Sequence, residues 1–400
     1  MVMEDILLLV VLTYGVSLSV GYLLQRYLKM PWMFASLFFG LLLSASGVFA
    51  STIQSDLFKL LETVGMYLLL FIIGFSIDLK KMASLKTYVI LGTIIIIGVE
   101  GLAGSFLLYF GFPAEVSNSF LIALITAMSF ATVGEAVLLP ILSEFKVINT
   151  TFGQLTLGIG TLDDIVEVMM LAAVAVLPGF LSITQTEVFP NPLLVLLDLV
   201  AILLISLLMM KAGSAVKRLL EKNHTPPYIY SLLTMFILFS FVALGGLVEE
   251  SLATVGAIFG GIVLRGLLPK ERLAENEKAV EFLGYIFLSP FFFLGVGGNV
   301  SVTAIAVAPV LIGFIWFVAT SSKLLAAYSL FQRKLGAKYS LLLGFGLSVR
   351  FSTGLIVQYV LLNSGLITPT LFSALVATAI FMTPIIIGFY SWGLSKAKPP

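Results

Sequence analysis

Apolar runs of about 20 residues follow one another along almost the whole chain, and they limit the possible folds more than any other feature. Each run is long enough to cross the hydrocarbon core of a bilayer as a helix. Only 11% of the residues are charged, whereas about a quarter of a soluble domain is charged. The sequence therefore predicts an all-α polytopic membrane protein with thirteen transmembrane helices. The predicted spans are residues 6–24, 32–50, 57–77, 88–110, 118–142, 152–177, 190–210, 228–248, 250–268, 279–297, 302–330, 339–362 and 367–392.

The Lys and Arg residues are distributed unevenly among the predicted loops. Nearly all of the 22 follow an odd-numbered span, as Arg26, Lys81 and Arg333 do. Because cationic loops tend to stay in the cytoplasm, we expect the N-terminus outside and the C-terminus in the cytoplasm. The expected location is the plasma membrane, as a multi-pass protein. A wrong number of spans would destroy this alternation of charge.

Several kinds of chemistry are excluded by the residues that the chain contains. It has no cysteine and a single histidine, His224, so disulfides, thiol chemistry and His-rich metal centres are absent. The net charge of +1 indicates no attraction to nucleic acid. We therefore expect a protein that is not an enzyme, has no cofactor and acts in the lipid bilayer.

An odd number of spans permits an inverted repeat. If spans one to six match spans eight to thirteen, with the seventh as a linker, matched helices run in opposite directions across the membrane. Many secondary transporters have this plan, and their sites lie near the middle of the membrane on interrupted helices. Spans five and twelve both place Gly, Ser, Thr and a charge near their midpoints, at residues 129–135 and 344–354. We expect these two helices to break there and to cross.

Two adjacent acids, Asp163 and Asp164, lie near the midpoint of the otherwise apolar sixth span. An ionised Asp at the centre of a transmembrane helix costs about 2.5–3.5 kcal/mol on insertion scales. The alternative interpretation is a structural pair that is neutralised by neighbouring helices. That need does not require two adjacent acids, so the pair favours a site where Asp163 and Asp164 bind a metal cation, Na+ or K+, or a proton.

Two cations, Lys323 and Arg350, also lie within predicted spans, and intramembrane acids are their available partners. We expect Lys323 to pair with an aspartate, the alternative being that its side chain extends to the cytoplasmic surface. Glu135 and Arg350 are the candidates to offset the helix dipoles that meet at the crossing. Packing by small residues is the alternative explanation of spans five and twelve.

Oxygen ligands for a dehydrated cation are expected from the same layer. Thr132 and Glu135 are the candidate side chains, with Ser129 and Ser352 as supporting hydroxyls and with carbonyls freed by the helix breaks. Glu167 follows Asp163 by one helical turn and is a candidate to act through the aspartates. Glu100 and Asp198 also lie within spans, and the sequence indicates no partner for either.

Several motifs resemble those of cation:proton antiporters, specifically the two-aspartate branch of the Na+/H+ antiporter superfamily, from about residue 6 to 395. The most specific match runs from Gly153-Gln154 through Leu157-Gly158 to Asp163-Asp164-Ile165. The segments Phe71–Lys81, Pro290–Gly297 and Val349–Val357 are similar to further family motifs, and Lys323 matches an intramembrane Lys.

The resemblance implies two moving parts and a homodimer. Core-domain helices four to six and eleven to thirteen, within residues 86–178 and 299–400, would move in an elevator fashion against the dimerisation domain. That domain would comprise residues 1–85 and 223–298, and residues 179–222 would form the linker helix. Carried over by position, Asp164 would be the main carrier of the ion and the proton, and Asp163 would pair with Lys323. Two acids would imply electrogenic exchange.

The chain departs from the family pattern at the crossing, where Ser352 replaces a Glu and Glu135 replaces a small or hydroxyl residue. Exchange of Na+, or of K+ or Li+, for protons is the favoured function, with K+/H+ antiport as the nearest alternative. A sodium-coupled organic anion symporter would need more spare cations than Arg350. An intramembrane aspartyl protease would need its acids on different helices, and an ion channel would need a continuous polar pore.

Overall fold

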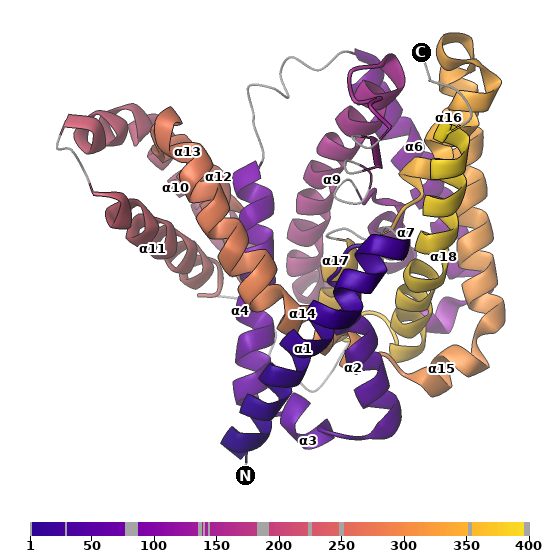
Figure 1. Ribbon diagram of the computed structural model, residues 1–400, viewed down its shortest axis with the longest axis horizontal. Helices are drawn as coiled ribbons and strands as arrows, with labels where there is room; N and C mark the ends of the chain where they lie inside the picture. Colours follow the sequence, from indigo (N-terminus) through magenta and orange to yellow (C-terminus); the bar gives the residue numbers. More distant parts are fainter. Residues whose placement is uncertain are drawn as a thin grey trace. The chain divides into compact units, whose positions relative to one another are not determined.

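All regular structure in the described part of the computed structural model is helical (Figure 1). The structure describes residues 2–28, 30–76, 87–134, 138, 141–142, 145–181, 192–222, 226–247, 252–350 and 354–395. The chain divides into two compact units. Unit 1 comprises Met1–Val10, Ser51–Leu79 and Leu171–Gly295, and unit 2 comprises Val11–Ala50, Lys80–Met170 and Val296–Pro400.

The helices that build the two units, some of which pass from one unit to the other, have the following bounds. They are α1 (Val2–Leu28), α2 (Phe34–Ser46), α3 (Ala50–Ile53), α4 (Asp56–Ser76), α6 (Thr87–Phe106), η1 (Leu107–Gly111), η2 (Pro113–Val116), α7 (Phe120–Ala131), α9 (Thr151–Leu181), α10 (Pro192–Lys222), α11 (Pro227–Gly245), α12 (Leu252–Leu267), α13 (Lys270–Glu281), η3 (Phe282–Leu288), α14 (Ser289–Gly298), α15 (Val302–Val307), α16 (Pro309–Leu347), α17 (Gly354–Asn363) and α18 (Pro369–Ser395).

Seven helices of the described residues are apolar and long enough to cross a membrane. The candidate spans are Glu4–Leu28, Asp56–Ser76, Thr87–Gly111, Pro227–Gly245, Glu275–Gly298, Pro309–Leu347 and Pro369–Ser395, and α2, α7, α12 and α17 are shorter apolar helices. The all-helical, membrane-spanning architecture predicted from composition is therefore confirmed. The count of thirteen spans, the inverted repeat and the orientation of the termini stay predictions.

In unit 1, α12 packs against both α4 and α11. At two glycines of α12 the neighbouring backbone is so close that a larger side chain would not fit. A Cβ atom at Gly261 would overlap the carbonyl oxygen of Phe71 on α4, and one at Gly256 would overlap that of Phe241 on α11. Small residues allow such backbone approach, which drives helix association where the lipid is as apolar as the side chains. These backbone contacts explain the presence of glycines in the apolar sequence of α12.

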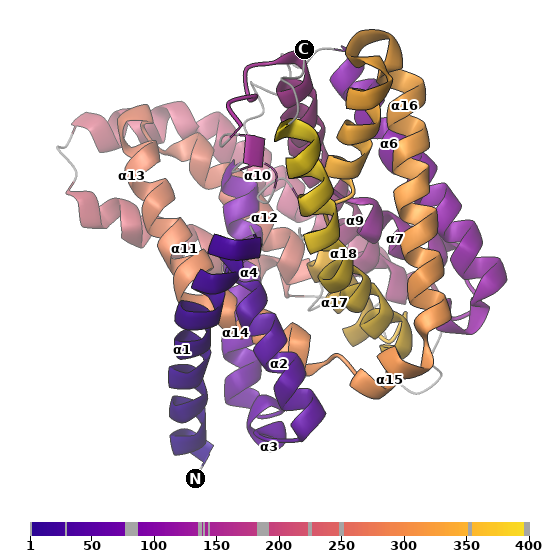
Figure 2. The ribbon, with the colours of Figure 1, turned by 45° about the vertical axis from the view of Figure 1, so that its right-hand side comes forward.

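In unit 2, α16 packs against α6 and α18, and Figure 2 shows these helices side by side. The 39 residues of α16 include Gly336, whose φ of 77° and ψ of 161° are not helical, so two helical segments meet there. A positive φ is readily adopted by glycine because it has no Cβ. The first segment carries Lys323 and the second ends at Leu347, which brings the chain to Arg350.

Candidate functional site

The site begins where α7 stops, because Ala131 is its last residue and Thr132 is extended, with φ of −70° and ψ of 164°. Residues 132–134 are not helical, and residues 349–350 beyond the end of α16 are not helical either. Gly134 N–H donates to the Val349 carbonyl oxygen at 2.8 Å. The two interrupted segments therefore lie against each other inside unit 2, and their remaining backbone groups need partners in the protein.

Asp163 of α9 supplies one of these partners. Asp163 is fully buried, and its Oδ2 accepts a hydrogen bond from Val133 N–H in the interruption after α7. A carboxylate oxygen is a strong acceptor for an amide that helix geometry no longer satisfies. The acid is thereby fixed at the interruption rather than along the surface of α9.

Lys323 supplies the opposite charge. Its Nζ donates to the carbonyl oxygens of Thr132, at 3.1 Å, and Leu347, at 2.5 Å. These carbonyls lie at the C-terminal ends of α7 and α16, where the helix dipole is negative and a cation is stabilised. The ammonium also lies 3.3 Å from Oε2 of Glu100, with both side chains fully buried. Two carbonyl acceptors and one carboxylate in an ion pair thus surround the ammonium.

Glu100, on α6, connects the two cations of the site. Its other oxygen, Oε1, accepts from Nη2 of Arg350 at 2.9 Å, and the Arg350 side chain is only 6% exposed. The guanidinium lies over the ring of Phe130, 5.2 Å from the centroid, in a cation–π contact. One carboxylate is therefore shared between Lys323 and Arg350 in the interior of unit 2.

This arrangement contains an acid, Glu100, for which the sequence indicated no partner. The sequence predicted an aspartate, Asp163 by family position, as the partner of Lys323, and that pairing stays a prediction. Glu100 lies within ion-pair distance of Lys323. The role predicted for Glu135 at the crossing stays a prediction, because Glu135 lies outside the described residues; Arg350 contacts Glu100. The signal for Glu100 was an acid within the apolar fourth span. Its partners come from helices far along the chain, so only packing reveals them.

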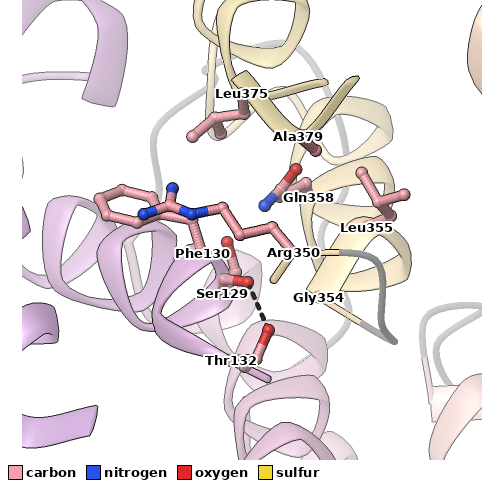
Figure 3. A pocket seen from close by; sticks show the side chains of 9 residues that line it. All are labelled: Ser129, Phe130, Thr132, Arg350, Gly354, Leu355, Gln358, Leu375 and Ala379. Atoms are coloured by element: carbon pink, nitrogen blue, oxygen red, sulfur yellow. Dashed lines mark hydrogen bonds between the residues drawn. The ribbon is translucent and has the colours of Figure 1, made fainter. Parts of the chain in front are cut away.

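A small pocket opens beside the interruption, as Figure 3 shows. Thr132 Oγ1 donates to the Ser129 carbonyl at 3.0 Å, and Ser129 Oγ donates to the Thr126 carbonyl at 2.7 Å. Arg350 crosses the pocket toward Phe130, and the amide of Gln358 on α17 lies near it. The hydroxyl oxygens of Thr132 and Ser129 thus line the pocket together with a cation, whose charge disfavours a bare metal ion at that end.

The family model described as "Sodium/hydrogen exchanger, transmembrane" matches residues 15–392. The chain belongs to the sodium/hydrogen exchanger family. A Na+/H+ antiporter of Enterococcus hirae is 28% identical to it, over 94% of this chain and 96% of that protein. The Na+/H+-K+ antiporter GerN of Bacillus cereus is 26% identical, over 83% of this chain and 82% of the relative.

The fold of this exchanger-family chain matches a solved structure of the sodium proton antiporter MjNhaP1 from Methanocaldococcus jannaschii. The TM-score is 0.63 with 16% identity, over 96% of this chain and 97% of the other. This likeness shows the fold, whereas the family model and the relatives confirm the predicted membership of a monovalent cation:proton antiporter family. Assignment to the two-aspartate branch stays a prediction.

The remaining predicted residues of this exchanger-family chain are placed only in part. Asp164 and Glu167 lie on the backbone of α9, one and four residues after Asp163, and their side chains are outside the description. Glu135 and Ser352 lie outside the described residues. Among the residues that are described, no group of three His, Cys, Asp or Glu side chains could hold a metal ion.

Proposed function

We propose that this chain exchanges a monovalent cation, Na+ foremost, for protons across the plasma membrane. The observation that carries the proposal is the buried meeting of two interrupted segments with Asp163 and Lys323 in unit 2. Helix interruptions free backbone carbonyls for a cation in a region without water, and transporters use them in this way. Membership of the exchanger family and the names of the relatives support the same activity.

In the proposed mechanism, the cation and the proton compete for the aspartates. Asp164 is the carrier, Asp163 holds the interruption through Val133, and the Thr132 hydroxyl and nearby carbonyls complete the oxygen ligands. A bare carboxylate is costly to move through hydrocarbon. The carrier therefore crosses only when loaded with one ion or the other, and exchange follows without a further gate.

The proposed movement is an elevator. The core-domain residues 86–178 and 299–400 carry the site across the membrane, while residues 1–85 and 223–298 stay fixed and form the contact of a homodimer. Because the two adjacent acids can release protons together, we propose that exchange is electrogenic. Glu135, Ser129 and Ser352 are proposed to influence selectivity from positions around the crossing.

A K+/H+ antiporter is the second candidate, since the curated name of the Bacillus cereus relative includes both Na+ and K+. Both candidates use the same site, because Na+ and K+ both bind oxygen ligands. The ion is chosen by the number and distance of those oxygens, so transport measurements must separate the candidates.

The test is an assay in proteoliposomes that contain an internal pH dye. Na+, K+ and Li+ are added in turn, with and without a K+ shunt that removes the membrane potential. We expect Na+ to release internal protons in the wild type, and Asp164→Asn to abolish this signal because an amide binds neither proton nor cation well. Asp56→Asn, at the exposed start of α4, is the control. Full activity of Asp164→Asn would overturn the site assignment.

A further inference from the structure

Glu100 is a buried acid that the proposed function does not use. It is fully buried on α6, and both of its oxygens contact cations: Oε1 with Arg350 at 2.9 Å and Oε2 with Lys323 at 3.3 Å. An acid in this position is expensive in hydrocarbon and is retained where a partner and a function require it. Glu100 therefore contacts Lys323 from α6, whereas the aspartates lie on α9.

We propose that Glu100 is a positioning residue that sets the affinity of the exchanger for its cation. This inference rests on the proposed exchange at the aspartates and deepens it. Glu100 holds the ammonium of Lys323 at the carbonyls of Thr132 and Leu347, and it balances charge that would otherwise repel an incoming Na+. It does not contact the transported ion.

The charges around Glu100 support this role. From α16 and the segment that follows it, Lys323 and Arg350 face the carboxylate. Of the other elements packed on α6, α7 and η1 contain no charged residue. The third, α9, contacts α6 at Gly158 and Val89 and carries Asp163. Without Glu100, two buried cations would remain opposite Asp163, the one further described acid of the crossing. Coulomb interactions are strong at low dielectric, so this imbalance would reach the aspartates.

Loss of Glu100 would also release Lys323. Its ammonium would keep two carbonyl acceptors and lose its ion-pair partner. A buried ammonium without an opposite charge would pair with another acid. Pairing with an aspartate would place it in competition with the cation. Both effects weaken cation binding, and both favour the release of protons from the aspartates.

The experiment compares Glu100→Gln with the wild type in proteoliposomes, using Na+ as the probe. We expect the apparent KM for Na+ to rise about tenfold or more, which corresponds to losing one charge interaction. We expect a smaller change in the maximal rate, and a pH profile that moves toward lower pH because the site becomes more positive. Glu100→Asp keeps the charge and is expected to retain most of the affinity.

The double variant Glu100→Gln with Arg350→Gln separates charge from shape. It removes one acid and one cation, so the net charge of the cluster returns to that of the wild type. We expect its KM to fall back toward the wild-type value, although both side chains are altered. Glu62→Gln, a buried acid of α4 in unit 1, is the matched control and is expected to leave the KM unchanged.

Every outcome decides between the alternatives. An unchanged KM and pH profile in Glu100→Gln would overturn the inference, and so would a loss of maximal rate alone, which a merely structural residue would produce. If Glu100→Gln does not fold, Arg350→Gln alone gives the opposite comparison: it leaves the cluster one charge more negative, so the KM for Na+ is expected to fall, and an unchanged KM would overturn the inference. If the wild type exchanges none of the three cations for protons, the proposed function itself is wrong. If the wild type exchanges Na+ for protons and Glu100→Gln has the same KM and pH profile, only the inference about Glu100 is wrong.

Discussion

The two units of this protein bury charge in different ways. In unit 2, Glu100 is buried together with Lys323 and Arg350, beside the interruption that holds Asp163. In unit 1, the described ion pair joins Arg272 and Glu275 on the surface of α13, where the two side chains are 37% and 56% exposed. Unit 1 also buries an acid, Glu62 of α4, and its helix backbones approach closely at Gly256 and Gly261.

The difference teaches which contacts can change during transport. Backbones in van der Waals contact have a single good arrangement, because a close-packed interface has no second fit. A buried carboxylate beside two cations can be rebalanced when an ion or a proton binds nearby. We therefore expect unit 1 to act as the fixed scaffold of the proposed exchange and unit 2 to hold its ion site. Three predictions test this comparison.

The largest effect is expected from adding one methyl group in each unit. In unit 2, a Cβ at residue 354 would overlap the Ser129 carbonyl oxygen and crowd the Thr132 hydroxyl. We expect Gly354→Ala to slow exchange at least tenfold, since a displacement of about 1 Å at a site can cost about 100-fold. In unit 1, we expect Gly261→Ala to lower stability by about 1–3 kcal/mol through overpacking. The exchange rate per folded molecule of Gly261→Ala should equal that of the wild type.

These variants are compared by proteoliposome transport and by thermal unfolding in detergent. Gly98→Ala on α6 is the control, because a Cβ there would have no neighbour within 4 Å. If Gly261→Ala stopped exchange in folded protein while Gly354→Ala did not, the distinction between scaffold and ion site would be wrong.

A middle effect is expected from Lys323→Met, which keeps the length of the side chain and removes its charge. The site becomes more negative, so protons leave it less readily and the pH profile of exchange should move toward higher pH. This is the opposite direction to Glu100→Gln. The measurement is the rate of Na+-driven proton release across a pH series, with the exposed Lys338→Met as control. An unchanged profile would count against a role for Lys323 at the site.

The smallest effect is expected from the surface pair of unit 1. Arg272→Gln with Glu275→Gln removes an ion pair whose nitrogen and oxygen lie 2.7 Å apart on exposed side chains. Exposed pairs contribute about 0–1 kcal/mol, so stability and exchange should both stay close to wild type. A large loss in either measurement would show that α13 has a role that its exposure does not indicate.

Much of the site was predictable because the cost of charge in hydrocarbon is a property of each residue alone. That cost singled out Asp163, Lys323, Arg350 and Glu100 before any contact was known. That cost does not indicate which charges contact each other, and the resemblance to the family predicted Asp163 as the partner of Lys323. The observed partner, Glu100, follows from the packing of α6 on α16.

The sequence by itself determined that the chain is helical, that it lies in the membrane and that its family is that of cation:proton antiporters. Apolar length and local motifs carry this information in consecutive residues. Only the tertiary structure decided which charges meet, because Glu100 and Arg350 are 250 residues apart in the chain. The ion pair forms because the packing of α6 on α16 and the two helix interruptions bring the side chains together. Residues that are neighbours in the sequence do not encode the distance between side chains on different helices.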